Sequence, residues 1–589
     1  MIAQAAQMAA APGGFVPPEV AWFALTPLII VISAGVLGVL VEAFVPANRR
    51  RVVQVIMAMA ALAAAFAVIV WQGVSWFGEG GSGGVVVLGG VLQLDGVALL
   101  FQGLVVLMAF FALAVVIDRT STKQDAFSPS AASIPGSEYE ELARRLGLVQ
   151  TEVYPLLMFA ISGMMIFPAA GDLLTMFIAL EVLSLPLYVL SGMARRRRLL
   201  SQEASFKYFV LGAFASAVFL FGAALLYGYS GSVKISEITT MASTVVGGGA
   251  PDHWELLWLV GILMVISGLL FKVGAVPFQA WTPDVYQGAP TPITGFMAAC
   301  TKIAAFGALL RLIYAGGFSG TPDMLEAVRI ALWVVAIATM IVGTVVGATQ
   351  TDMKRMLGYS SIAHAGFVLV GILSFNGAGI KAVIFYLLAY GMATVGAFAV
   401  ITLVRETGPG GEVLGEATHL GQWAGLGKRS PWLAGCFSVF LLSFAGIPLT
   451  AGFIAKFSAF SAAVEGTEVL GNATVLAVIG VLASAVAVFF YIRVIVIMFF
   501  MSPAETVVES VVETVDVAVL EPVVVGVGQG VANAAHTSVV VATGAPAVVV
   551  VRSEGPSAVT ITVMAVGILV LGIFPAPVLD LIARMTGIG

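Results

Sequence analysis

Residues 255–280 read ELLWLVGILMVISGLLFKVGAVPFQA, an apolar run with Lys272 and Pro277 close to its end. A helix that crosses a bilayer needs about 20 mostly apolar residues, and this run has that length. A charge inside the hydrocarbon core costs about 3 kcal/mol on insertion scales. A proline interrupts the hydrogen bonds of a helix. The stretch therefore predicts a membrane-spanning helix that is broken beside a buried lysine.

The same character extends over most of the chain. Of its 589 residues, 60% are hydrophobic and 10% are charged, whereas a soluble domain carries about 25% charged residues. The apolar runs are continuous rather than alternating, which predicts helices and argues against a membrane β-barrel. We expect an all-α integral membrane protein with about 14 transmembrane helices. They are predicted near 20–45, 52–72, 94–117, 153–170, 172–193, 204–229, 255–280, 291–316, 326–348, 356–374, 378–404, 431–459, 472–501 and 558–583.

Lysine and arginine collect in the loops that follow odd-numbered spans, and cytoplasmic loops carry an excess of these residues. We therefore predict that both termini face away from the cytoplasm. The first span is expected to remain in the protein, because Met1–Glu19 lacks the basic segment of a signal peptide. The basic loop residues are Arg49, Arg50, Arg51, Arg119, Lys123, Arg144, Arg145, Arg195, Arg196, Arg197, Arg198, Lys354, Arg355, Arg405, Lys428 and Arg429.

Two pairs of residues suggest an internal repeat. Lys207 opens the sixth span and Lys381 opens the eleventh, 174 residues later. Pro277 interrupts the seventh span and Pro448 the twelfth, 171 residues later. An offset of five spans would invert the second unit in the membrane, and inverted repeats with broken helices are typical of transporters. Chance is the alternative, because proline is common in membrane helices and lysine often closes a helix end.

Charged residues inside the predicted spans are the candidates for chemistry. Glu181, Lys272, Lys302 and Lys456 lie in the middle of apolar runs, and Lys207 lies about one turn inside its span. Burial disfavours the charged form of each group and an opposite charge favours it. A buried lysine beside a glutamate can therefore be switched between holding and releasing a proton, whereas an arginine stays protonated.

Each of these residues also has a structural interpretation. Lys207 can extend its amine to the membrane surface, and His364 in the tenth span is either a proton relay or a hydrogen-bonded packing residue. Asp172 is expected to cap a helix. The four mid-span charges together predict ion or proton handling, and a scaffold whose charges only lock helices together is the alternative.

The chain lacks the motifs of soluble redox enzymes. It has no phosphate-binding glycine loop, no paired cysteines for an iron–sulfur cluster and no histidine pairs placed for haem. Cys300 and Cys436 both lie in apolar runs, where we interpret them as small hydrophobic residues. We expect no metal, no cofactor and no nucleic acid bound to this chain.

Several motifs resemble one family closely. KVGAVPF at 272–278 and WTPDVYQGAPTP at 281–292 are similar to subunit N of bacterial NADH-quinone oxidoreductase, respiratory complex I. The segments LEVLSLPLYVL at 180–190, EASFKYF at 203–209 and KRMLGYSSIAH at 354–364 resemble it too. The likeness is strong over residues 150 to 500 and looser in the first three helices and the last.

The resemblance implies two inverted five-helix repeats (helices 4–8 and 9–13), broken helices 7 and 12, and one proton channel. It assigns Glu181 as a charge partner and Lys207, Lys272, Lys302 and Lys456 as proton-path residues. Many relatives carry a histidine where this chain has Gln279, so we expect an amide with water in its place. His364 is a possible relay, and the helix breaks are expected at Pro277 and Pro448.

The resemblance also implies an organisation of the chain and its setting. We divide it into 1–150 (three helices and a cytoplasmic loop), 151–316 (repeat 1), 317–501 (repeat 2), 502–556 (a cytoplasmic insertion) and 557–589 (a C-terminal helix). The insertion is predicted from its composition, rich in Val, Ala, Thr and Gly with scattered Glu, and departs from the family pattern. The protein is expected in the bacterial plasma membrane, where it would couple NADH-to-quinone electron transfer to proton pumping.

The implied partners are the sister antiporter-like subunits, the small membrane subunits of the complex and the lipid bilayer. NADH, FMN, iron–sulfur clusters and quinone are expected on other subunits. The alternative function is that of a subunit of a multisubunit cation/proton antiporter, which shares the fold.

Overall fold

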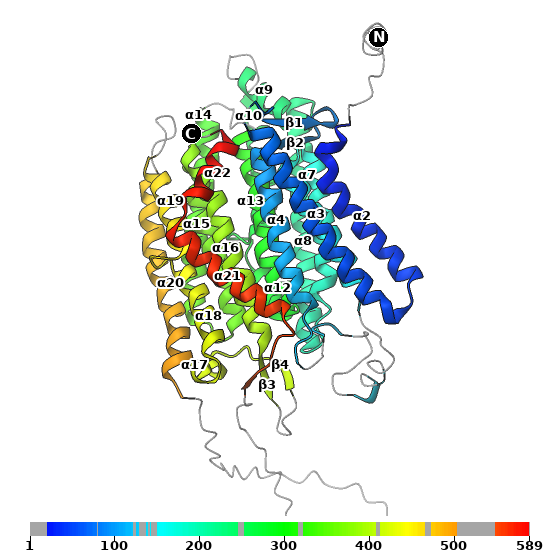
Figure 1. Cartoon of the computed structure of the whole chain (residues 1–589). Helices are drawn as coiled ribbons and strands as arrows, with labels where there is room; N and C mark the ends of the chain where they lie inside the picture. The colour runs from blue at the N-terminus through cyan, green and yellow to red at the C-terminus, as the bar shows by residue number, and fades with distance from the viewer. Residues whose placement is uncertain are drawn as a thin grey trace, which may run out of the picture.

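The computed structural model describes residues 20–78, 80–121, 125–128, 137–139, 142, 150–245, 252–315, 322–407, 413–465, 473–502 and 548–587. Most of the predicted 502–556 insertion lies outside these residues. The described chain is a bundle of long helices that run between two ends of the molecule (Figure 1).

The helices follow the apolar runs of the sequence. Eleven described segments are long and apolar enough to cross a membrane, and two shorter ones, Val153–Ala169 and Pro431–Ala445, are also apolar. The helices are α2 (Trp22–Phe44), α3 (Ala47–Phe77), α4 (Gly96–Ile117), α6 (Val153–Ile166), α7 (Leu173–Ser191), α8 (Arg198–Ser230), α9 (Ile235–Val245), α10 (Asp252–Val273), α11 (Trp281–Gly288), α12 (Thr291–Phe296), α13 (Lys302–Leu310), α14 (Pro322–Thr349), α15 (Met353–Ile372), α16 (Gly377–Leu403), α17 (Leu426–Arg429), α18 (Pro431–Ala445), α19 (Ala451–Glu465), α20 (Thr474–Phe500), α21 (Pro556–Ile573) and α22 (Ala576–Thr586).

Two of the predicted spans are interrupted around their prolines. α10 ends at Val273 and α11 begins at Trp281, with Pro277 in the connection. The chain turns at Gly274, whose φ of +73° favours glycine. α18 ends at Ala445 and α19 begins at Ala451, with Pro448 between them. Each interruption frees backbone carbonyls and amides inside the bundle.

The C-terminal helix was predicted as one piece, and this is wrong. The chain forms α21 up to Ile573 and then a separate helix, α22, from Ala576. Pro575 precedes α22, and a proline in the first turn of a helix cannot donate the hydrogen bonds that would continue the preceding one. α22 runs along the side of the upper half of the bundle in Figure 1, beside α4 and α16.

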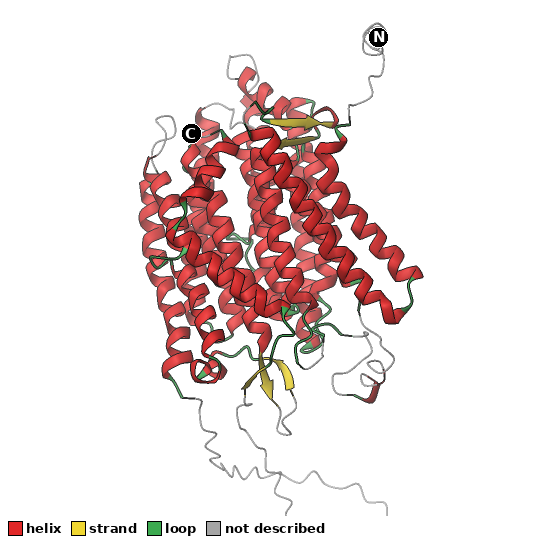
Figure 2. Ribbon diagram, in the orientation of Figure 1, coloured by secondary structure: helices red, strands yellow, loops and turns green. Residues whose placement is uncertain are grey.

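The fold also contains two small sheets, which the prediction of an all-α protein missed (Figure 2). β1 (Gly84–Val87) pairs antiparallel with β2 (Leu92–Asp95) at one end of the bundle. At the other end, β3 (Val404–Thr407) pairs with β4 (Val413–Glu416) and with β5 (Val548–Val550), in the order β4-β3-β5. These strands are too short to stand out as periodic patterns in the sequence. The protein is therefore mostly helical, with one small antiparallel sheet at each end of the bundle.

Asp118, which caps the end of α4, holds the segment before α21. Its carboxylate accepts hydrogen bonds from the backbone amides of Glu554 (3.1 Å) and Ser557 (3.0 Å) and from the Ser553 hydroxyl. Burial alone would raise the pKa of Asp118, but these bonds and the one from the Thr120 amide favour the charged form and lower its pKa. This carboxylate ties α21 to the end of α4.

The centre of the bundle is formed by the segment Thr291–Tyr314 and by α15 and α16, which are buried along almost their whole length. The outer helices α3, α8 and α20 expose large apolar side chains, such as Trp71, Phe214 and Phe489. A wide apolar surface of this kind is expected where a protein faces lipid. The fold is therefore that of a multi-pass membrane protein, as the sequence predicts.

Candidate functional site

Lys272 occupies the last turn of α10, just before the helix breaks. It is 2% exposed, and its Nζ has no hydrogen-bond partner among the described residues. The Nζ lies 5.1 Å from the ring centroid of Tyr188 and 5.0 Å from that of Tyr208. The faces of aromatic rings attract a cation at such distances. Lys272 is thus a buried amine surrounded by rings.

Glu181 lies on α7, about two turns before Tyr188. Its side chain is half-buried, and its Oε1 accepts no hydrogen bond in the described part of the chain. Its charge acts on Lys272 electrostatically, yet the ion pairs between described residues do not include one between these two side chains. The assignment of Glu181 as the partner of Lys272 stays a prediction, because the influence of Glu181 on Lys272 is electrostatic and without a direct ion pair between the two described side chains.

Lys302 follows a local distortion of its helix. α12 continues into a π-helical turn, Met297–Thr301, and Lys302 opens α13 directly after it. Such turns recur at functional sites. The Lys302 Nζ donates to the backbone carbonyl of Ser361 at 2.5 Å and lies 5.8 Å from the ring centroid of Tyr390. The Ser361 hydroxyl is 3.2 Å from the hydroxyl of Tyr286, so Lys302 is connected to both α15 and α11.

His364 on α15 is buried among aromatic side chains. Its Nδ1 is 2.8 Å from the hydroxyl of Tyr386, and its Nε2 is 3.3 Å from the hydroxyl of Tyr491. Both Lys302 and Lys456 act on the ring electrostatically. His364 therefore lies within the field of two buried lysines and is bonded on both sides. This geometry is compatible with a relay and with a packing residue.

Lys456 binds the end of a neighbouring helix. Its Nζ donates to the carbonyls of Phe444 (2.9 Å) and Ala445 (3.1 Å), the last two residues of α18, and to the Ser484 hydroxyl at 2.7 Å. These carbonyls lack helical partners because α18 stops there, and the C-terminal end of a helix dipole attracts a cation. The break that contains Pro448 thus creates the site for Lys456.

Gln279 lies in the connection between α10 and α11, close in sequence to Pro277. Its side-chain Oε1 is buried and accepts no hydrogen bond from the described residues. The hydroxyl of Thr282, at the start of α11, is likewise unpaired. Two unpaired polar atoms within this break could hold water, and the relay role of Gln279 stays a prediction.

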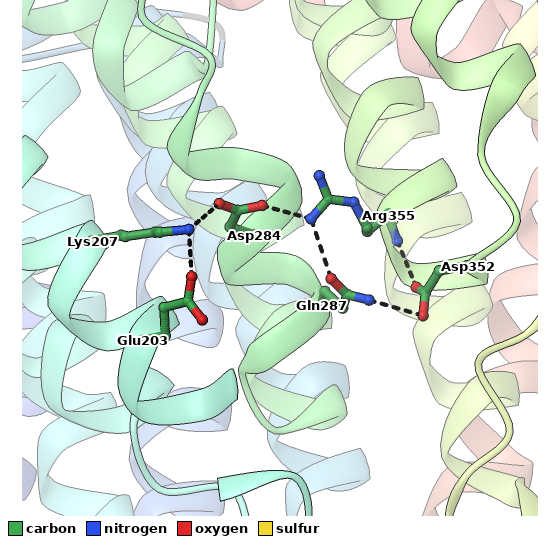
Figure 3. A network of polar contacts seen from close by, with 6 residues as sticks. All are labelled: Glu203, Lys207, Asp284, Gln287, Asp352 and Arg355. Carbon is green, nitrogen blue, oxygen red and sulfur yellow. Dashed lines mark hydrogen bonds and ion pairs between the residues drawn. The ribbon is translucent and has the colours of Figure 1, made fainter. Parts of the chain in front are cut away.

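Lys207 belongs to a chain of charges that joins three helices (Figure 3). Its Nζ is 2.6 Å from Glu203 on its own helix and 2.8 Å from Asp284 on α11. The other oxygen of Asp284 binds Arg355 of α15 at 2.6 Å. One carboxylate therefore bridges α8 and α15 through α11, the second half of the broken helix.

The chain of contacts continues along α15. Arg355 Nη1 donates to Gln287 Oε1 at 3.2 Å, and Gln287 Nε2 donates to Asp352, which caps α15 (Figure 3). Lys207 is therefore more than a lysine that extends to the surface. Lys381, its predicted counterpart, is half-buried on α16 without an ion pair among the described residues. Sequence reasoning missed Asp284, because an acid near the end of an apolar run is typical of loops.

A second ion pair that the sequence did not reveal joins Arg311 to Asp95. Arg311 is 2% exposed, and its guanidinium binds both carboxylate oxygens of Asp95 at 2.5 and 2.7 Å. It also donates to the Pro168 carbonyl at 3.0 Å. This pair fixes the end of the central helix to the start of α4 and lies apart from the buried lysines.

The described residues contain no group of three histidines, cysteines or acids that could hold a metal ion. Cys300 is buried, Cys436 is half-buried, and neither forms a disulfide. The ionisable groups of the site are thus lysines, a histidine and acids, the side chains that hold and pass protons.

Comparison with known proteins identifies the family. The chain is 55% identical to NADH-quinone oxidoreductase subunit N of Beutenbergia cavernae, over 97% of this chain and 99% of that protein. It belongs to the NADH-quinone oxidoreductase subunit N family. A second member, from Rhodococcus opacus, is 50% identical over 82% of this chain and 88% of its own length. Residues 170–487 match the family profile described as NADH:quinone oxidoreductase/Mrp antiporter, TM.

Solved structures agree with membership in the subunit N family. A chain of respiratory complex I from Thermus thermophilus is 28% identical and superposes with a TM-score of 0.67 over 95% of this chain and 99% of its own. A chain of the Mrp complex from Dietzia sp. superposes with a TM-score of 0.71 at 23% identity, over 96% of both chains, a likeness of fold alone. The family predicted from the motifs around Lys272 is confirmed.

Proposed function

We propose that this chain is a proton-translocating membrane subunit of an NADH-quinone oxidoreductase. The observation that carries the proposal is the series of buried lysines, each beside a discontinuity of a helix. Lys272 ends α10 before its break, Lys302 follows a π-helical turn, and Lys456 binds the open end of α18. Discontinuous helices supply unpaired backbone groups that hold ions, protons and water inside a membrane.

A proton would pass through the subunit in steps. Energy arriving from a neighbouring subunit would change the influence of Glu181 on Lys272, and Lys272 would release its proton toward Lys302 through water. The contacts of Lys302 with Ser361 on α15, and of His364 with Tyr386 and Tyr491, support a continuation toward Lys456. Each lysine changes its proton affinity when the neighbouring charge changes.

The arrangement in the membrane is part of the proposal. We propose fourteen crossings in two inverted five-helix units, with both termini on the non-cytoplasmic side of a bacterial plasma membrane. The end of the bundle with the β4-β3-β5 sheet would face the cytoplasm. The arginines of the loop between α7 and α8 and of β3 are charges expected on that side. Sister antiporter-like subunits would adjoin this chain, and NADH, FMN, iron–sulfur clusters and quinone would be held by other subunits.

The substitution Lys456→Met tests the proposal in the assembled complex. It removes the proton carrier but keeps an unbranched apolar side chain of similar length. We expect quinone reduction coupled to pumping to fall strongly in membrane vesicles. Lys428→Met is the matched control, because Lys428 is exposed on α17 and should be neutral. Normal turnover and a normal proton-to-electron ratio in an assembled Lys456→Met complex would contradict the proposal.

The cation/proton antiporter is less well supported, because the likeness to the Mrp complex is one of fold. The polypeptides that copurify with the chain separate the two functions. Flavin and iron–sulfur subunits are expected for the oxidoreductase, and cation-dependent transport without them would favour the antiporter.

A further inference from the structure

A groove on the outside of the bundle is not used by the proton path. It has a volume of about 380 Å³ and lies between α3, α4, α16 and α22. Its walls are apolar except for Arg584, and run from Phe66 on α3 to Gly78 directly after that helix and from Leu99 to Leu107 on α4. Val70 and Val74 in this wall are 49% and 68% exposed, so the groove opens toward the surface that faces lipid.

The groove has the length of one leaflet. Residues 66–78 of α3 span about 18 Å at 1.5 Å per residue, and half of a hydrocarbon core is about 15 Å thick. The backbone of Met585 on α22 touches Gly96, the first residue of α4, so the C-terminal end of α22 lies at the end of the bundle with the β1-β2 sheet. The groove therefore runs from that membrane surface toward the middle of the bilayer.

Arg584 is placed where the head group of a lipid would lie. It is exposed at the surface end of the groove and has no hydrogen bond or ion pair with any described residue. Asp580, one turn earlier on α22, is also exposed but does not line the groove. A basic side chain above an apolar channel matches a phosphate above an acyl chain.

We propose that this groove binds one acyl chain of an anionic phospholipid, with Arg584 in contact with the phosphate. Pockets that bind small ligands measure about 300 to 1,000 Å³, and the groove volume is at the lower end of that range, which suits a single chain. The apolar walls select the chain, and the single cation selects the anionic head group.

The proposed lipid would lie against a helix of the proton path. Ile384 and Leu388 of α16 form part of the groove wall. Tyr386 and Tyr390 belong to the same two turns, and they contact His364 and Lys302 on the inner side. An occupied groove would support this helix from behind, so turnover of the complex is expected to depend on the lipid.

The test uses the purified whole complex and counts bound phospholipid by native mass spectrometry. Gly103→Leu fills the groove, because a Cβ at Gly103 meets only Ile69 at an ordinary 3.6 Å. We expect this variant to lose one phospholipid per complex. Arg584→Gln should lower the affinity of the detergent-solubilised complex for added phosphatidylglycerol by about fivefold, the effect of one basic residue near a membrane surface, and leave the affinity for phosphatidylcholine unchanged.

Gly435→Leu is the control, because a Cβ at Gly435 has nothing within 4 Å and the residue lies on α18, away from the groove. An unchanged lipid count in Gly103→Leu would overturn the proposal. So would a photo-crosslinker at Leu104 that captures another polypeptide of the complex, because the groove would then be a protein interface. If Gly103→Leu does not assemble, the head-group preference of Arg584→Gln decides. Lipid counts do not depend on proton transfer, so a failure here is distinct from a failure of the proposed function.

Discussion

Asp284 forms ion pairs with basic side chains of two different helices. Removing its charge therefore tests whether these contacts matter for the surroundings of Lys272. It binds Lys207 of α8 at 2.8 Å and Arg355 of α15 at 2.6 Å. Trp281, one turn earlier on α11, stacks on Tyr208 of α8 with centroids 4.6 Å apart. Tyr208 is also one of the rings around Lys272. We expect Asp284→Asn to release α11 and to disturb the surroundings of Lys272 without touching it.

The magnitude follows from the exposure of the three side chains. They are 28%, 29% and 39% exposed for Asp284, Arg355 and Lys207, so solvent weakens each ion pair. Exposed pairs contribute about 0.2–1 kcal/mol and hydrogen bonds to charged groups about 1.5–3 kcal/mol. We expect a coupling free energy of about 1 kcal/mol between Asp284 and Arg355. This corresponds to a change of about fivefold in the rate of quinone reduction.

The assay is a double-mutant cycle on NADH-driven quinone reduction and proton pumping in membrane vesicles, normalised to the amount of assembled complex. Asp284→Asn and Arg355→Gln should each lower the rate, and the double variant should be no worse than the poorer single variant. Glu326→Gln is the control, because it breaks an exposed ion pair on α14. Losses that multiply in the double variant would refute the idea that the two residues act as one unit.

Three further predictions concern parts that hold the fold. Asp118→Asn should lower the thermal stability of the subunit at pH 7, and the difference from the wild type should vanish as the pH falls through the lowered pKa of Asp118, because a protonated carboxyl loses the same bonds. Asp95→Asn should cost about 2 kcal/mol of folding free energy and reduce the amount of assembled subunit on immunoblots, because it removes the charge opposite the buried Arg311 and leaves that guanidinium with its bonds to Pro168 and Gln93. Gly274→Ala should lower the melting temperature of the purified complex, because its φ is +73° and a Cβ would lie 2.6 Å from the Thr282 hydroxyl; an unchanged melting temperature would contradict this reading.

The sequence predicted those parts of the fold that depend on local composition. The predicted ranges 20–45 and 94–117 coincide within a few residues with α2 and α4, because apolar length determines where a helix crosses a membrane. The small sheets could not be predicted in this way. β5 pairs with β3 across more than 140 residues, and such a contact leaves no periodic pattern in either segment.

In the candidate site, too, the sequence predicted what depends on local composition and missed what depends on contacts between distant segments. Lysines in apolar runs are conspicuous in a sequence, and Lys272, Lys302 and Lys456 were identified for that reason. The partners of Lys456 are backbone carbonyls and those of Lys272 are aromatic rings, which carry no charge signal. Asp284 lies in a short helix between two apolar runs, and its role depends on two helices that approach it only in the folded chain.

The sheet formed by β3 and β5 has a consequence for the length of the chain between α20 and α21. α20 ends at Phe500, and β5 returns the chain to the bundle at Val548, so this connection is anchored at both of its ends. The entropy of closing such a connection rises by only about 0.6 kcal/mol for each doubling of its length. The pairing of β5 with β3 therefore fixes the place where the chain rejoins the bundle before α21, and this place does not depend on the number of residues between Phe500 and Val548.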